Sequence, residues 1–110
     1  MKLPIRIWTS KKRLRGYVGF SFFIFIFVAR EAYDHDMIIR HETIHFKQQV
    51  EMLFIGMWIM YVFEMVRNYI KYKNFDKAYR NNVFEREAYA NDEDEDYLKN
   101  RKFWAWNRYW

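Results

Sequence analysis

The chain has 110 residues, enough for one hydrophobic core, so we expect a single domain over 1–110 and exclude a separate regulatory domain. Hydrophobic residues make up 52% of the chain and aromatic residues 23%, a composition too apolar for a disordered protein. The formal charge is +5, and the absence of cysteine excludes disulfides, iron–sulfur clusters and zinc sites built from thiolates.

The predicted elements begin with strands. Residues around Ile7 indicate a short strand, and the basic run 11–15 indicates an exposed turn. The uncharged run 16–29 has 14 residues, too few for a bilayer-spanning helix of about 20. Its β-branched and aromatic side chains favour one strand over 17–28 that is covered on both faces. We therefore expect the strands of 1–30 to form a β-hairpin.

Two helices are predicted next. The polar residues 31–36 indicate a loop, and Asp36 is placed to be the N-cap of a helix from 37 to about 51. Apolar and histidine side chains recur along this helix at helical spacing. Gly56 is expected to bend or end it before a strongly apolar helix that reaches about residue 73.

A third helix is predicted over 76–90, after a link that begins at Asn74. The helices that carry the candidate site thus span 36–91. Residues 92–96, with the sequence DEDED, are expected to be a solvated break, and 92–110 to form an acidic and then aromatic tail. The fold class expected from this order is α+β, with an N-terminal hairpin followed by a mainly helical core.

The segment HETIH, residues 41–45, contains the pattern HExxH. Side chains four residues apart on a helix lie on one face with their Cβ atoms about 5–6 Å apart, so His41 and His45 can bind one zinc ion. Glu42 is turned about 100° from the first of them, so it would flank the metal in the position of a general base. The alternative is two ordinary histidines on a helix that binds no metal.

A catalytic zinc site needs a third protein ligand and an open position for water. His35 is the only other histidine, and it lies before the predicted start of the helix. The segment FEREAYAN, residues 84–91, offers Glu85 and Glu87, whose side chains point about 200° apart on a helix, so only one of them can bind the metal. An alanine lies one turn beyond each glutamate, so periodicity does not choose between them.

These segments resemble the gluzincin zinc peptidases, in which HExxH lies on one helix and a glutamate ligand on a later one. The chain is more closely similar to small bacterial HExxH proteins with a downstream FExEAY segment and a tail of the type YLxxRKFxAW, here 84–89 and 97–106. The resemblance implies a minimal gluzincin-like core. In membrane-embedded gluzincins the glutamate of E-x-x-A binds zinc, which favours Glu85, and Glu87 is the alternative because E-x-x-A-N also fits from there.

The resemblance implies the function of a zinc metallopeptidase with one Zn²⁺ per chain. His41, His45 and Glu85 would bind the metal, and Glu42 would act as the general base. The substrate would be a peptide or protein, and Tyr89 or Tyr33 could donate to the oxyanion. The alternative function is a non-catalytic zinc-stabilised or membrane-associated interaction module that keeps a gluzincin-like site.

Partners and location are expected from the apolar stretch 52–63. Glu51 and Glu64 flank it about 20 Å apart on a helix, short of the roughly 30 Å hydrocarbon core of a bilayer. We therefore expect peripheral membrane contact or a homodimer through 52–63. The N-terminus lacks the apolar core of a signal peptide, so we expect a cytoplasmic or peripherally attached protein that is not secreted. No nucleic-acid partner is expected, because the basic run 11–15 suits an exposed turn.

Overall fold

The computed structural model describes residues 3–110. The strands are β1 (Ile5–Thr9), β2 (Gly19–Phe22) and β3 (Phe25–Ala29). The helices are α1 (His35–Glu51), α2 (Ile55–Tyr72), α3 (Phe75–Arg80), α4 (Val83–Asn91), α5 (Tyr97–Asn100) and the 3-10 helix η1 (Ala105–Tyr109). Helices contain 55% of the residues and strands 13%, which confirms the α+β fold class.

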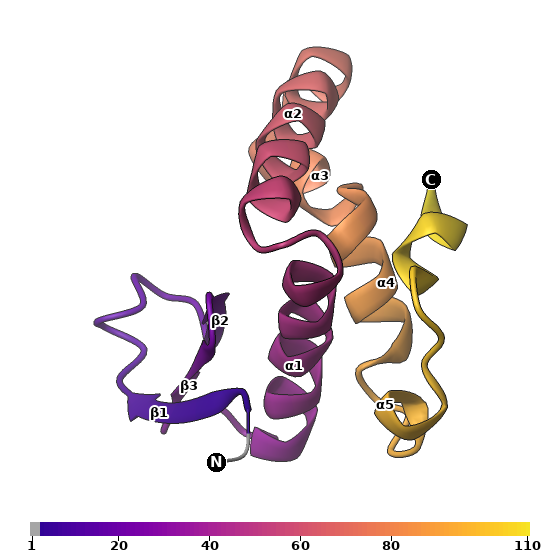
Figure 1. The fold of residues 1–110 in the computed structure, drawn as a ribbon. Helices are drawn as coiled ribbons and strands as arrows, with labels where there is room; N and C mark the ends of the chain where they lie inside the picture. The colour runs from indigo at the N-terminus through magenta and orange to yellow at the C-terminus, as the bar shows by residue number, and fades with distance from the viewer. Residues whose placement is uncertain (1–2) are drawn as a thin grey trace.

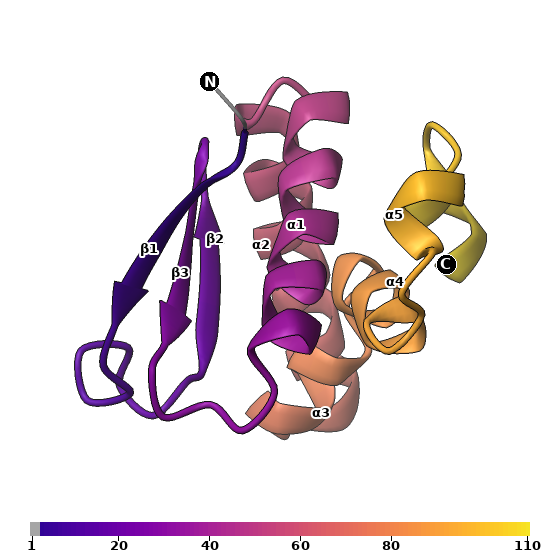
Figure 2. The same cartoon turned by 90° about the horizontal axis from the view of Figure 1, so that it is seen from below.

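The elements form three layers. The sheet packs against one side of α1, and α4, α5 and the C-terminal tail lie on its other side (Figure 1). Seen from below, the sheet is one outer layer, α1 and α2 are the middle layer, and α4 and α5 are the other outer layer (Figure 2). The predicted metal-binding helix is therefore covered on both sides.

The sheet differs from the expected hairpin. β3 is central, with β1 parallel to it and β2 antiparallel, so the predicted strand 17–28 is in fact two strands that turn at Phe23. A single strand of that length would extend about 40 Å, which exceeds the longest dimension of the molecule, 37 Å. The Phe23 amide donates to Gln49 Oε1 at 2.8 Å, which holds the turn against α1. β2 is an edge strand, and Phe20 and Phe22 are exposed, so it is not covered on both faces.

The ends of the first two helices, Glu51 and Tyr72, agree with the predicted ends at about 51 and 73, but the start of α1 and the break between the helices differ from the prediction. The N-cap of α1 is Asp34, whose carboxylate accepts from the Met37 amide at 3.0 Å, so the helix begins at residue 35. Asp36 lies inside the first turn, where its charge suits the helix dipole. The break after α1 comes at Leu53 and Phe54, which have φ values of 54° and 62°, and not at Gly56, which lies within α2.

The predicted helix 76–90 is also two helices. Asn82 interrupts it as the N-cap of α4, with its side-chain oxygen accepting from the Phe84 amide at 3.1 Å. The tail contains α5 and η1, and Trp106 of η1 packs into the core cluster with Phe84. Asp92 is buried, so the expectation of a solvated break holds only from 93 onward.

A buried ion-pair network joins the tail to α1 and α4. The Arg101 guanidinium donates to both oxygens of Glu51, at 2.9 and 3.0 Å, and to both oxygens of Glu87, at 2.6 and 3.0 Å. All three side chains are at most 5% exposed. The Trp104 amide also donates to Glu51 at 2.7 Å. This network fixes the rotation of α4 relative to α1.

None of the helices in 3–110 is by itself both long and apolar enough to cross a membrane. α1 and α2 reach the necessary length and composition only as a pair, and that pair is bent by 112° at its break.

Replacing Arg101 with Met should lower the free energy of unfolding by about 3–5 kcal/mol, because two carboxylates would be left buried and unpaired. Urea unfolding followed by circular dichroism measures the change. The matched substitution Arg80→Met breaks an ion pair with Asp76 whose side chains are 61% and 72% exposed, and it should cost less than about 1 kcal/mol. Equal losses in the two variants would contradict this role for Arg101.

Candidate metal centre

Three of the predicted site residues converge between α1 and α4. His41 and His45 lie one turn apart on α1, and their Nε2 atoms are 3.3 and 3.0 Å from Oε1 of Glu85 on α4. The three side chains are buried, and each offers a ligand atom within 4.8 Å of the others. The structure thus brings together two nitrogens and one carboxylate oxygen, the ligand set typical of a catalytic zinc site.

Glu87 lies away from this cluster. Its oxygens accept hydrogen bonds from Gln48 Nε2 at 3.0 Å and from the Tyr97 hydroxyl at 2.6 Å, in addition to the Arg101 guanidinium. Because these donors occupy a fully buried carboxylate, Glu87 has no free oxygen to offer a metal. The arrangement separates the two candidates that periodicity left open: Glu85 faces the histidines, and Glu87 faces the tail.

The outer nitrogens of both imidazoles are held by acceptors. His41 Nδ1 lies 3.0 Å from Asp92 Oδ2, and His45 Nδ1 lies 2.8 Å from Gln48 Oε1. When each Nδ1 carries the proton, both Nε2 lone pairs point at the Glu85 carboxylate oxygen. Lone pairs on three atoms repel one another unless a cation or protons lie between them, so the residues present fit a divalent metal.

The roles of Asp92 and Gln48 were not predicted from the sequence. Gln48 lies one turn beyond His45 on the same face of α1, so helical spacing could have indicated it. The role of Asp92 could not be predicted, because no local sequence pattern distinguishes this residue from the four exposed acids that follow it.

Two further residues that the sequence did not indicate shape the site. The Tyr61 hydroxyl of α2 donates to Glu85 Oε2 at 2.8 Å, which orients the carboxylate. Gly19 of β2 lies directly against Glu42, since a Cβ atom there would be 2.7 Å from Ile38 Cγ2 and 2.8 Å from Glu42 Oε2. Only glycine therefore lets β2 approach α1 this closely.

A cavity of about 480 Å³ opens between β2 and α2 at this cluster. Glu42, His45 and Glu85 are its charged and metal-binding groups, and most of its other lining is apolar. Apolar lining residues come from both sides, from β2 and from α2 and α3: Phe20, Trp58, Val62, Val66 and Phe75. The cluster is therefore accessible to a ligand with apolar groups.

The two predicted oxyanion donors lie in different places. Tyr89 packs edge-on against His41, with ring centroids 4.6 Å apart, and its hydroxyl donates to the Tyr79 hydroxyl at 3.4 Å. Tyr79 itself lines the cavity. Tyr33 is 92% exposed on the loop before α1 and is not part of the cavity wall. The structure thus places Tyr89 beside the cluster and Tyr33 away from it.

Burial and the neighbouring charges shift the pKa values of the residues in this cluster. Burial disfavours the His41 imidazolium, but hydrogen bonds to Asp92 and Glu85 outweigh it and raise the pKa of His41 to about 10. Burial also opposes ionisation of Glu85, yet the two imidazoles hold the pKa of this carboxyl well below its usual range. Burial raises the pKa of Glu42. In the metal-free protein, protons on the imidazoles supply the positive charge that the cluster needs.

Comparison of the chain with protein families, with curated proteins and with solved structures found no match. The site is therefore supported by its geometry and by the chemistry of its residues.

The metal-free protein should lose stability as the pH rises. The folded pKa of His41 is about 10, above its ordinary value of 6.5. The stabilisation of the folded state by the His41 imidazolium is therefore complete below about pH 6.5 and is lost as the pH rises through about 10. We expect the melting temperature to fall by about 5 °C or more over this interval, measured by circular dichroism after chelation. Asp92→Asn should reduce this fall in melting temperature. An equal fall in that variant would contradict the assignment of the pH dependence to His41 and Asp92.

Proposed function

We propose that the protein is a zinc-dependent hydrolase, specifically a metallopeptidase, that binds one Zn²⁺ through His41, His45 and Glu85. The observation that carries the proposal is the convergence of both Nε2 atoms on one Glu85 oxygen, beside Glu42 and open to a cavity. A structural zinc site is usually closed by four protein ligands, and among 3–110 only these three form such a group. Three ligands beside a cavity favour a catalytic site.

Zinc bound there would polarise the substrate carbonyl and lower the pKa of a bound water towards 7. The residues around the proposed zinc have separate roles. Asp92 and Gln48 orient the imidazoles through their Nδ1 atoms. Glu42 is placed to accept a proton from the attacking water and to return it to the leaving amine. The pKa of Glu42 is raised by burial, which brings the carboxylate closer to the basicity that this transfer requires.

Tyrosine hydroxyls can stabilise the negative charge that develops on the substrate oxygen. Tyr61 and Tyr79 both line the cavity, and burial raises the pKa of each well above its usual range, so both stay protonated. The single hydroxyl hydrogen of Tyr61 is donated to Glu85 Oε2, whereas the Tyr79 hydroxyl accepts from Tyr89 and keeps its own hydrogen to donate. These positions favour Tyr79 over Tyr61 and over the tyrosines predicted from the sequence.

Replacing Glu42 with Gln should leave one zinc per chain but lower turnover by about 100-fold or more, because only the proton acceptor is removed. Zinc is quantified by mass spectrometry of the metal, and turnover by cleavage of a peptide library. Glu93→Gln changes an exposed glutamate in the same way and should have no effect. Full zinc without turnover in the unmodified protein would favour the non-catalytic zinc module instead.

The third ligand is tested by two neighbouring substitutions. Glu85→Gln should weaken zinc binding by 10-fold or more, because it removes a ligand charge. Glu87→Gln should weaken it less, since Glu87 is not a ligand and acts on the site indirectly, through Gln48 and through the ion pair with Arg101 that positions α4. Competition with a chromogenic chelator measures both affinities, with His45→Ala as the variant expected to lose the metal. The opposite ranking would move the ligand to Glu87.

A further inference from the structure

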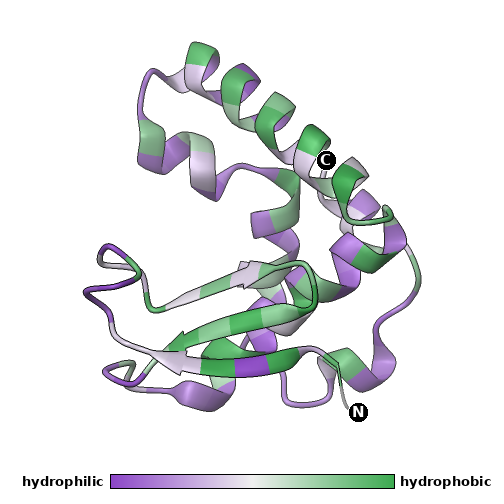
Figure 3. Cartoon of the chain, turned by 60° about the vertical axis from the view of Figure 1, so that its left-hand side comes forward, coloured by the Kyte–Doolittle hydropathy of each residue, from purple (hydrophilic) through white to green (hydrophobic). Residues whose placement is uncertain are grey.

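The outward side of α2 is apolar along the whole helix. The side chains of this α2 face are between 54% and 73% exposed: Ile55, Ile59, Val62, Phe63, Val66 and Ile70. The helix's only acid, Glu64, points inward and is buried. Figure 3 shows the hydrophobic colour recurring at each turn of α2. A continuous apolar face of this length is uncommon on a monomer in water.

Two apolar turns adjoin the first residues of the α2 face. Phe23 in the β2–β3 turn contacts Phe54 in the α1–α2 turn, with ring centroids 4.7 Å apart. Phe22 is 53% exposed and Leu53 is 82% exposed. Exposed turns normally use glycine, asparagine, aspartate or proline, yet Phe23, Leu53 and Phe54 take positive φ values here. The exposed side chains of Phe22, Phe23 and Leu53 extend the apolar surface beyond the start of α2.

Charge is distributed unevenly about this face. Lys71 and Lys73 follow directly at the far end of α2, and Lys77 lies in α3; all three are exposed. The exposed acids at the start of α1 and in 93–96 lie at the end of the molecule opposite to α2 (Figure 1). Basic residues therefore border the apolar face, while most of the acids lie far from it. This polarity is complementary to anionic phospholipid headgroups.

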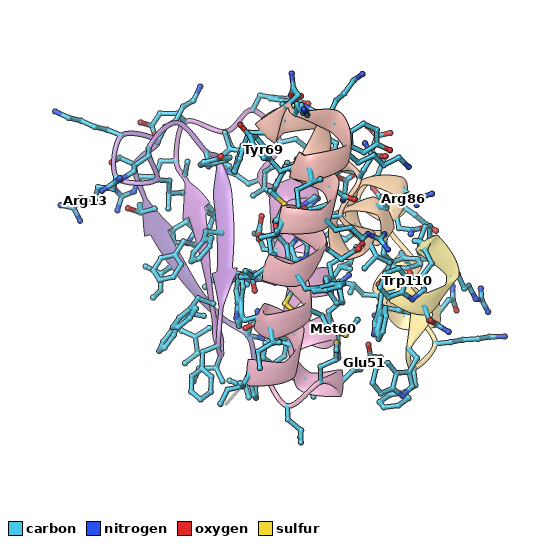
Figure 4. All side chains as sticks on the ribbon, turned by 90° about the horizontal axis from the view of Figure 1, so that it is seen from above. Arg13, Glu51, Met60, Tyr69, Arg86 and Trp110 are labelled. Atoms are coloured by element: carbon cyan, nitrogen blue, oxygen red, sulfur yellow. The ribbon has the colours of Figure 1, made fainter. Side chains whose placement is uncertain are left out.

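Aromatic residues of the tail border the α2 face on its other side. Figure 4 shows α2 in front, the sheet on one side of it, and the tail with Trp110 on the other. The Arg67 guanidinium of α2 lies 5.9 Å from the Trp110 ring centre, and Trp110 is 51% exposed. Tryptophan beside a basic side chain is typical of the interface between lipid and water.

We propose that the α2 face and the two apolar turns lie in the interfacial layer of an anionic phospholipid bilayer, with the lysines after α2 binding the headgroups. α2 would lie along the membrane and not across it, as amphipathic interfacial helices do. This inference is independent of the zinc site, because none of its residues belongs to the metal cluster.

A second copy of the chain fits the α2 face less well. Ile55, Ile59, Val62 and Val66 do follow the 4–3–4 spacing of a helix-pairing seam. The positions beside such a seam normally carry charges, but here they carry Phe63 and Ile70, which a two-helix contact would leave in water.

Flotation of the full chain with vesicles tests the proposal. Vesicles of phosphatidylcholine with about one third phosphatidylglycerol should carry the protein to the top of the gradient, and vesicles of phosphatidylcholine alone should carry less. Ile59→Glu with Phe63→Glu should weaken partitioning at least tenfold. Lys71→Glu should weaken it by several-fold on anionic vesicles only, as expected for a basic group near the headgroups.

Matched control variants separate the α2 face from general effects of charge. Tyr33→Glu places the same carboxylate on an exposed aromatic position of the loop before α1, and Lys99→Glu reverses a lysine charge on α5. Both should float as the unmodified chain does. All variants replace exposed side chains, and unchanged circular dichroism and zinc content establish that each is folded.

The outcomes are distinct. Loss of flotation in the α2 variants alone supports the proposal. A chain that stays in the aqueous fraction with both kinds of vesicle overturns it. So does a homodimer in sedimentation analysis that Ile59→Glu with Phe63→Glu dissociates, because that result would assign the face to a second copy. Loss of peptide cleavage with normal flotation would contradict the proposed zinc site and leave the membrane proposal supported.

Discussion

The structure depends on the convergence of two imidazole nitrogens and one carboxylate oxygen at a buried point between α1 and α4. These atoms attract one another only when positive charge lies between them, as protons in the metal-free protein or as a metal ion in the proposed one. Asp92 and Gln48 hold the outer ring nitrogens, so neither imidazole can turn away from Glu85. The packing of α4 on α1 is thereby coupled to the occupancy of the site.

The two glutamates of α4 lie on opposite sides of the helix and have different roles. Glu85 faces the histidines, while Glu87 receives Arg101 and Gln48. Gln48 links the two sides, because its oxygen lies at His45 and its amide nitrogen donates to Glu87. The Arg101 network therefore sets the rotation of α4 and, through that rotation, the position of Glu85. The tail supports the site without contributing a ligand.

Periodicity was sufficient to place HExxH on one face of a helix, because that placement depends only on local geometry. The choice between Glu85 and Glu87 could not be made locally, since it depends on Arg101 in the distant tail. The turn at Phe23 was missed because its residues are not those that turns prefer, and its position is fixed by a bond to Gln49. Asn82 did carry a capping signal, which the apparent continuity of 76–90 obscured.

α2 connects the two proposals because its two sides have different surroundings. Met57 packs into the core, Tyr61 reaches Glu85, and Val62 and Val66 are both cavity wall and part of the exposed face. If that face lies in lipid, the mouth of the cavity lies at the membrane surface. An apolar peptide segment that partitions into the interface would then reach Glu42 along a continuous apolar path. The peptide segment would not first have to be transferred from the membrane into water, which costs about 25 cal/mol for each Å² of apolar surface.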